Sequence, residues 1–258
     1  MSRMLGFVSG LSMTPVEALG ADLLEEFRNL SHLHADGWGI ATAPPIRVST
    51  GLSSVADGWP ASREIAGRSG ILYLRFASAD SAVSKENLQP FAADGLAFAH
   101  NGALAPLSIG ASALSFDELH ALRGTTDSEV YFALARRDRI DDEPIEESVA
   151  GAVALVRSLY PSACLNAMLL DGDDLLVVHS SGTVAPPLAA FSRRGTVGAR
   201  LPVGHGDDYN LLSTAALRSG ARVVATTGVD QTGWTPLAND TVYAFGADGT
   251  TRSTPITR

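Results

Sequence analysis

The chain has 258 residues with 19 Lys and Arg against 28 Asp and Glu, which gives a formal net charge of −9. With 45% hydrophobic and 18% charged residues it can bury a sizeable core, which excludes a mainly disordered chain. Lys85 is the sole lysine, so the acidic chain lacks the clustered basic residues that nucleic acid or an anionic membrane requires, and we expect neither as a partner. The single cysteine, Cys164, excludes an internal disulfide and a multi-cysteine zinc site.

The first residues contain no apolar stretch of signal-peptide length, and no window approaches 18 consecutive apolar residues. We therefore expect a cytoplasmic protein. Ser2 is small enough that removal of the initiator methionine is expected to expose it as the new N-terminus.

The first half of the chain predicts a buried strand over residues 4–9 and then a helix to about residue 30. The helix start combines a capping box, Thr14 and Glu17, with Pro15 at the first helical position. Strands over 37–42 and 46–49 are expected to flank a Pro-Pro turn, and the apolar runs 71–76 and 95–100 have the length of strands.

The second half predicts helices over 127–136 and from Pro144 onwards, where the acidic residues 138–147 are interpreted as a solvated helix start. A hairpin follows, with strands 164–170 and 175–179. Further strands are expected over 188–192, 209–213, 222–226 and 241–245. No linker divides the chain, so we predict one α+β domain over residues 1–258.

Four stretches join polar residues to glycines: residues 34–39, 75–78, 100–102 and 124–129. Each has an ordinary structural interpretation. Asn101-Gly102 is typical of a turn, Thr126 of a helix N-terminus, and Arg75 of a structural ion pair.

Together these stretches resemble the class II glutamine amidotransferase family of N-terminal-nucleophile hydrolases. The nearest resemblance is to the small stand-alone branch that includes the ergothioneine-pathway γ-glutamyl amidohydrolase. The fold this implies is a four-layer αββα sandwich, with two antiparallel sheets between helical layers. The motifs are, in chain order, 2–6 (SRMLG), 35–39 (ADGWG), 75–78 (RFAS), 86–91 (ENLQPF), 98–102 (FAHNG), 126–129 (TDSE) and 165–166 (LN).

The resemblance implies catalytic roles for Ser2, Asn101 and Gly102. Ser2 would be the nucleophile, and its own α-amine, which titrates near pH ~8, would accept the proton. The Asn101 side-chain N–H and the Gly102 backbone N–H would form the oxyanion hole.

The resemblance also implies a binding site for the amino-acid end of a γ-glutamyl substrate. The planar guanidinium of Arg75 suits its carboxylate, Ser78 can add a hydroxyl, and Asp127 suits its ammonium. No cofactor and no metal are implied. We therefore interpret His34 as structural, His100 as packing behind Asn101, Trp38 as equally able to pack or to contact substrate, and Cys164 as core.

This sequence departs from the family at position 2, where the amidotransferases have a cysteine. A serine hydroxyl is harder to activate than a thiol, although other N-terminal-nucleophile hydrolases use serine or threonine. Three interpretations stay open: a natural serine hydrolase, an inactive relative that binds a γ-glutamyl ligand, or an engineered Cys-to-Ser change. The leading functional expectation is hydrolysis of a γ-glutamyl amide. The alternatives are a glutaminase subunit that supplies ammonia to a separate synthase and a non-catalytic binding domain, and a homo-oligomer is also possible.

Overall fold

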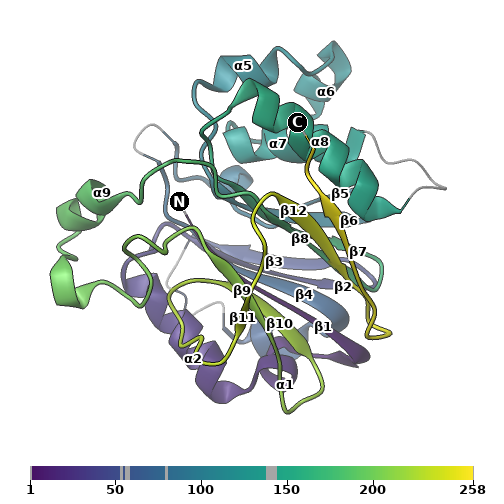
Figure 1. Cartoon of the computed structure of the whole chain (residues 1–258), viewed down its shortest axis with the longest axis vertical. Coiled ribbons are helices and arrows are strands. Elements are labelled where there is room, and N and C mark those ends of the chain that lie inside the picture. Colours follow the sequence, from purple (N-terminus) through teal and green to yellow (C-terminus); the bar gives the residue numbers. More distant parts are fainter. Residues whose placement is uncertain (1, 53–54, 56–58, 79–80, 138–143, 258) are drawn as a thin grey trace.

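Two antiparallel sheets stacked face to face form the centre of the computed structural model, which describes residues 2–52, 55, 59–78, 81–137 and 144–257 (Figure 1). The first sheet has the strand order β11-β9-β10-β1-β4-β2-β3 and the second β13-β12-β8-β7-β6-β5. In the first sheet the strands are β1 (Arg3–Met13), β2 (Trp38–Ala43), β3 (Arg47–Gly51), β4 (Gly67–Leu74), β9 (Leu212–Ala216), β10 (Arg222–Thr226) and β11 (Thr235–Pro236). In the second they are β5 (Phe91–Ala93), β6 (Leu96–Gly102), β7 (Leu165–Asp171), β8 (Asp174–His179), β12 (Thr241–Phe245) and β13 (Thr251–Pro255).

Side chains alternate between the two faces of each strand, and this alternation builds three apolar layers. In β1, Leu5 and Phe7 pack with the helices outside the first sheet, whereas Met4 and Val8 pack between the sheets. Between them Gly6 has no room for a side chain, because an added Cβ would lie 2.9 Å from side-chain atoms of the facing strands. The close approach of the two sheets therefore depends on small residues on their inner faces.

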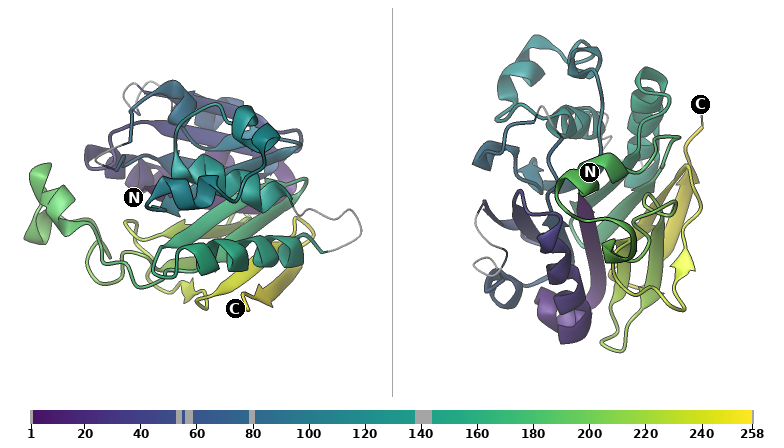
Figure 2. Two further views of the ribbon diagram at one scale, coloured as in Figure 1. Left: turned by 90° about the horizontal axis from the view of Figure 1, so that it is seen from above. Right: turned by 90° about the vertical axis from the view of Figure 1, so that its left-hand side faces the viewer.

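Helices cover both outer faces of the sandwich, as the two views of Figure 2 show. The first sheet is covered by α1 (Pro15–Leu19), α2 (Ala21–Asn29) and α4 (Ala61–Glu64). The second is covered chiefly by α7 (Asp127–Arg137) and α8 (Ile145–Leu159), beside which lie α5 (Leu107–Ala111) and α6 (Phe116–Ala121). Short 3₁₀ turns complete the chain at η1 (Leu30–His32), η2 (Lys85–Asn87) and η3 (Gly198–Arg200). The predicted α+β sandwich of two antiparallel sheets between helical layers is confirmed.

The predicted helix after residue 14 begins as expected, because the Thr14–Glu17 capping box is formed. It does not run unbroken to residue 30. Gly20 adopts a φ of 81°, ends α1 and precedes α2. A positive φ is incompatible with a continuing helix, so one predicted helix becomes two.

Two strand predictions were wrong. Residues 188–192 form the helix α9 (Leu188–Arg193) rather than a strand, and the strand predicted over 209–213 is displaced to β9. Asn101 and Gly102, a dipeptide that is typical of a turn, end strand β6. The acidic run is only partly a solvated helix start, because Glu146 is buried and pairs with Arg252 at 2.7 Å; residues 138–143 lie outside the described residues.

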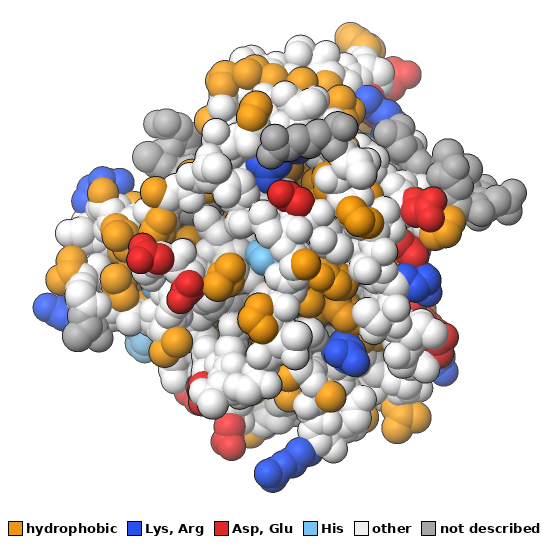
Figure 3. Space-filling model, viewed as in Figure 1, with side chains coloured by type: hydrophobic (Ala, Val, Ile, Leu, Met, Phe, Trp, Pro, Cys, Tyr) orange, Lys and Arg blue, Asp and Glu red, His pale blue; other side chains and the backbone are white. Residues whose placement is uncertain are grey.

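The segment around α9 projects from the sandwich beside the end where the N-terminus lies (Figures 1 and 2). Hydrophobic side chains gather on this projection in Figure 3, and Val184, Leu188, Val197 and Val203 are exposed. Among the helices of the described residues, none combines the length and apolar character that crossing a bilayer requires.

Candidate active site

Strand alternation directs several predicted site residues into the space between the two sheets at one end of the sandwich. In β4, Ile71 and Tyr73 pack between the sheets, and Arg75 follows with the same parity. In β6, Ala97 and Ala99 also pack between the sheets, and Asn101 lies on the same face of the strand. Because β1 and β4 are antiparallel, with Arg3 opposite Leu74, the start of β1 meets the end of β4, and Ser2 lies beside Tyr73.

These chain segments enclose a small pocket. Its lining includes five of the predicted site residues, namely Ser2, Arg75, Ser78, Gly102 and Asp127. Its volume is about 30 Å³, room for about one water molecule, so a bound γ-glutamyl group has to displace part of the lining.

Ser2 is buried, and its hydroxyl is held by two partners. The Oγ atom lies 2.6 Å from the hydroxyl of Tyr73, and the backbone N–H of Phe76 donates to it at 3.3 Å. Burial raises the pKa of Tyr73, so the phenol is protonated at neutral pH and can donate to Ser2. Both contacts fix the direction of the Oγ atom within the pocket.

Arg75 is buried at the pocket, and one of the two terminal nitrogens of its guanidinium already has hydrogen-bond partners. Its Nη2 donates to Ser81 Oγ and to the carbonyl of Ala82, both at 2.9 Å. Its Nη1 has no hydrogen-bond partner among the described residues. A buried guanidinium nitrogen without a partner costs about 1–3 kcal/mol or more, so this atom is available to a ligand carboxylate.

Asn101 is fully buried, and both atoms of its side-chain amide lack a partner within the described part of the chain. It stands between His100 and Gly102, which both line the pocket. At Gly102 an added Cβ would lie 1.9 Å from the carbonyl oxygen of Cys164, so only glycine fits here. Unsatisfied buried amides are rare in proteins and concentrate at functional sites.

Asp127 begins α7, and one of its carboxylate oxygens accepts from the backbone N–H of Leu104 at 2.5 Å. The other accepts from the N–H of Ser128 at 2.8 Å. Thr126 caps the helix as expected, since its hydroxyl accepts from the N–H of Glu129. Oδ1 also accepts from Ser128 Oγ at 3.4 Å, whereas Oδ2, the oxygen that accepts from Leu104, has a second lone pair left for a ligand ammonium.

His100 is itself part of the pocket lining, and its ring bonds Ser128 Oγ at 3.0 Å and the carbonyl of Cys164 at 3.1 Å. Burial lowers its pKa, against the opposing effect of Asp127. Cys164 is buried, and burial raises the pKa of its thiol to about 11. The thiol is therefore unreactive at neutral pH.

Sequence reasoning missed Tyr73 and the role of Arg3. Arg3 is fully buried, donates from Nε to the carbonyl of Ser2 at 2.6 Å, and stacks on the ring of Tyr209 at 3.8 Å. Its Nη1 donates to Thr227 Oγ1 at 2.9 Å. An arginine directly after the candidate nucleophile was the available signal, but no sequence pattern links it to partners more than 200 residues away.

His34, which we interpret from the sequence as structural, pairs with a second histidine. His34 Nε2 lies 3.0 Å from His205 Nε2, and both rings are buried. Burial lowers the pKa of both, to about 3 for His205, with a further contribution from Arg3. No group of three potential metal ligands occurs among the described residues.

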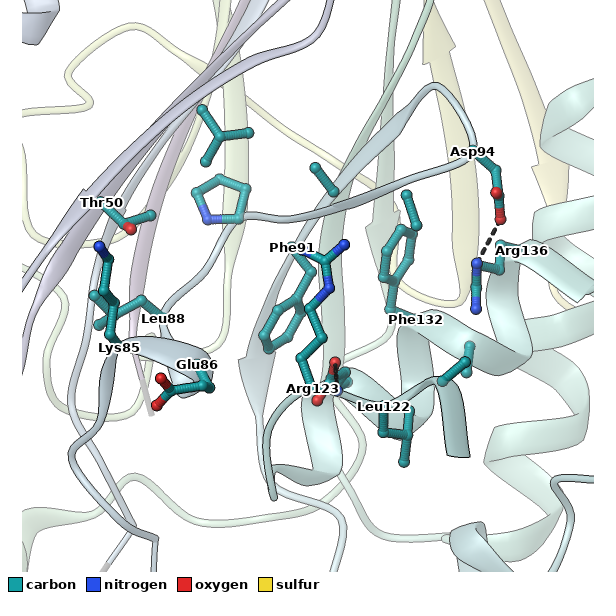
Figure 4. A pocket seen from close by; sticks show the side chains of 17 residues that line it. Thr50, Lys85, Glu86, Leu88, Phe91, Asp94, Leu122, Arg123, Phe132 and Arg136 are labelled. Carbon is teal, nitrogen blue, oxygen red and sulfur yellow. Dashed lines mark hydrogen bonds and ion pairs between the residues drawn. The ribbon is translucent and has the colours of Figure 1, made fainter. Parts of the chain in front are cut away.

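A larger cavity of about 540 Å³ lies between the edges of the two sheets and α7, outside this site (Figure 4). Lys85, Arg123 and Phe91 point into it, and Arg136 pairs with Asp94 at its rim. It contains none of the six predicted site residues, so this cavity is not the one that holds the candidate chemistry.

The family "Glutamine amidotransferases class-II" matches residues 1–255. No curated protein sequence matches the chain.

Three solved structures share the fold at identities below 20%. A glutamine aminotransferase class-II domain protein of Silicibacter pomeroyi superposes with a TM-score of 0.66 at 17% identity, over 99% of this chain and 100% of that one. A glutamine phosphoribosylpyrophosphate amidotransferase of B. subtilis gives 0.63 at 16% identity, over 99% of this chain but 49% of that one. A predicted glutamine amidotransferase of Pseudomonas aeruginosa gives 0.54 at 19% identity, over 96% and 98% of the two chains.

Proposed function

The chain belongs to the class II glutamine amidotransferases, and from this premise we propose that it hydrolyses a γ-glutamyl amide through Ser2. The observation that carries the proposal is the Ser2 hydroxyl, 2.6 Å from the Tyr73 phenol, in one pocket with Arg75 and Asp127. The unpartnered Arg75 Nη1 binds the α-carboxylate of the substrate, and Asp127 binds its ammonium. This pairing selects the amino-acid end and presents the side-chain amide to Ser2.

The reaction needs Ser2 at the mature N-terminus. After removal of Met1, the free α-amine accepts the Oγ proton as Oγ attacks the amide carbon. The Asn101 side chain and the Gly102 N–H stabilise the oxyanion, the C–N bond breaks, and the leaving nitrogen takes the proton. Water then hydrolyses the γ-glutamyl ester on Ser2 and releases glutamate. The reaction requires no cofactor.

The test uses protein whose intact mass shows that Met1 is absent. Glutamate release from glutamine and from several γ-glutamyl amides is measured, together with an acyl-enzyme in the mass spectrum. We expect turnover by the wild type and a fall of at least about 10³-fold in Ser2→Ala. A Met1-free protein that releases no glutamate and forms no acyl-enzyme would contradict the proposal and favour a binding domain.

The family leaves transfer as a second possibility, because the B. subtilis amidotransferase has a chain about twice as long as the part that superposes on this one. A glutaminase subunit would release ammonia from glutamine weakly alone and faster with a synthase partner. Co-purification from the native source, followed by a glutaminase assay with and without the partner, separates this function from hydrolysis of a conjugate.

A further inference from the structure

A second cavity of about 420 Å³ adjoins the Ser2 pocket. The two share Phe76, Ala77 and Ser78, and Gly102 in the first is followed by Ala103 in the second. Its other wall is the projecting segment around α9, and includes Arg193. The second cavity is therefore a neighbouring space that a group leaving Ser2 can enter.

The proposed binding mode sets the direction of the leaving amine. Arg75 and Asp127 hold the amino-acid end, so the amide nitrogen points away from them. Phe76 contributes its backbone N–H to Ser2 Oγ and its side chain to the second cavity. The nitrogen and its substituent therefore project towards Phe76 and α9.

The lining of the second cavity is mainly apolar, through Phe76, Ala103, Val184, Pro187 and Ala190. A cavity of this volume is within the range of small-molecule sites and far larger than ammonia needs. An amine with a sizeable apolar body fits this space better than the leaving group of glutamine.

Two arginines border the apolar lining, and they differ in availability. Arg194 is engaged: it pairs with Asp36 at 2.5 Å, donates to the carbonyl of Leu33 at 3.0 Å and stacks on Phe76 at 4.0 Å. These contacts hold the α9 segment against the body of the protein. Arg193 is exposed and forms no hydrogen bond or ion pair with any residue that the structure describes. A free guanidinium beside an apolar cavity favours a ligand that carries an anion.

We propose that the second cavity is the leaving-group site and that the substrate is a γ-glutamyl amide of an apolar amine bearing a carboxylate, which Arg193 binds. This inference rests on the proposed function and names its substrate class. When the C–N bond breaks, the nitrogen takes the proton and the amine occupies this cavity before it dissociates.

Three probes separate the contributions of the apolar body and the carboxylate. γ-Glutamyl-phenylalanine has both, γ-glutamyl-phenethylamide lacks the carboxylate, and glutamine lacks both. Calorimetric titration of Ser2→Ala measures binding without turnover. We expect γ-glutamyl-phenethylamide to bind about tenfold more tightly than glutamine through burial of the ring. γ-Glutamyl-phenylalanine should gain roughly a further fivefold, and lose that gain as salt is raised.

Arg193→Gln in the same background should remove the difference between the two aromatic probes, and Arg193→Glu should reverse it. Arg200→Gln is the matched control, because Arg200 is exposed in the same projecting segment but does not line the cavity. Equal binding of all three probes, or equal effects of the Arg193 and Arg200 changes, overturns the inference.

Turnover by the wild type is measured in parallel and keeps the two proposals distinct. Hydrolysis of glutamine at least as fast as of γ-glutamyl-phenylalanine sinks the substrate class but leaves the proposed function intact. Selective, Arg193-dependent binding without turnover of any probe supports the site and overturns the hydrolase.

Discussion

Two buried asparagines face each other across β6 and β7, and they have opposite surroundings. Asn166 donates to the carbonyl of Asn210 at 2.6 Å and accepts from the N–H of Ser180 at 2.9 Å. Asn101 lies opposite Asn166 in the strand register. Neither atom of its side-chain amide has a hydrogen-bond partner among the described residues. The same residue type, at equal burial, is satisfied on one strand and left open on the next.

Two arginines, Arg157 and Arg75, show the same contrast between satisfied and unsatisfied hydrogen-bonding groups. Arg157 is surrounded by carbonyls: Nη1 donates to Ala163 at 2.5 Å, and Nη2 to the carbonyl and hydroxyl of Ser180 at 3.0 and 2.5 Å. Arg75 keeps Nη1 open. A polar group satisfied by the protein stabilises the fold, whereas one left unsatisfied reduces stability and is available to a ligand.

The largest expected effect separates the two asparagines. Asn101→Ala should lower kcat by about 10²–10³-fold, because it removes one donor to the oxyanion. Its melting temperature should stay level or rise, since no hydrogen bond within the described residues is lost. Asn166→Ala is the matched control and should lower the free energy of unfolding by roughly 2 kcal/mol. A large loss of stability in Asn101→Ala, with turnover retained, would place Asn101 among the structural residues.

The second prediction separates the arginines. Arg75→Gln should lower kcat/KM by about 10²-fold, mainly through KM, because the substrate carboxylate loses its charged partner. Arg157→Gln should cost roughly 3 kcal/mol of unfolding free energy by leaving the carbonyls around it without donors. Urea unfolding and steady-state kinetics on both variants check this. If Arg75→Gln is as destabilised as Arg157→Gln and its KM is unchanged, the contrast between the two arginines fails.

Much of this contrast between satisfied and unsatisfied side chains could not be predicted from the sequence. The ordered motifs predicted the fold, and strand parity directs Arg75 and Asn101 between the sheets. Whether a buried side chain finds hydrogen-bond partners depends on residues distant in sequence. Asn166 bonds Ser180 and Asn210, whereas no local sequence pattern shows that the Asn101 amide lacks such partners. The roles of Ser2, Asn101 and Asp127 themselves stay predictions.

The projecting segment shows a second limit. The apolar character of residues 188–192 predicts a strand, but the six residues of α9 are too few to display a helical period. The missed signal was Pro187, directly before α9, since proline favours the start of a helix. The free Arg193 at the end of that helix becomes meaningful only once the cavity beside Ser2 is known.

The third prediction concerns pH and the His34–His205 pair near the site. Because the folded pKa of His205, about 3, lies below the ordinary value near 6.5, the unfolded state binds more protons between these values. The stability contributed by a neutral His205 is fully present above pH ~6.5 and is lost as pH falls towards its folded pKa, by at most about 1.4 kcal/mol per pH unit. His205→Gln should flatten this part of the pH dependence of unfolding free energy. His120→Gln, at an exposed histidine, is the control and should leave it unchanged. Equal slopes in the wild type and His205→Gln would rule out this contribution.

The smallest expected effect concerns Tyr73, whose ring has apolar surroundings and whose hydroxyl contacts the candidate site. Tyr73 packs in the apolar layer between the sheets, yet its hydroxyl bonds the candidate nucleophile at 2.6 Å. Tyr73→Phe keeps the ring and removes one neutral hydrogen bond, worth about 0.5–1.5 kcal/mol, so kcat should fall by roughly threefold to tenfold with KM unchanged. If the phenol acts by directing Ser2 Oγ, the acylation rate in single-turnover experiments should fall by the same factor as kcat. Tyr131→Phe is the matched control, since its buried hydroxyl bonds the carbonyl of Leu165 at 3.3 Å, outside the Ser2 pocket. A rise in KM with an unchanged acylation rate would instead assign Tyr73 to substrate binding.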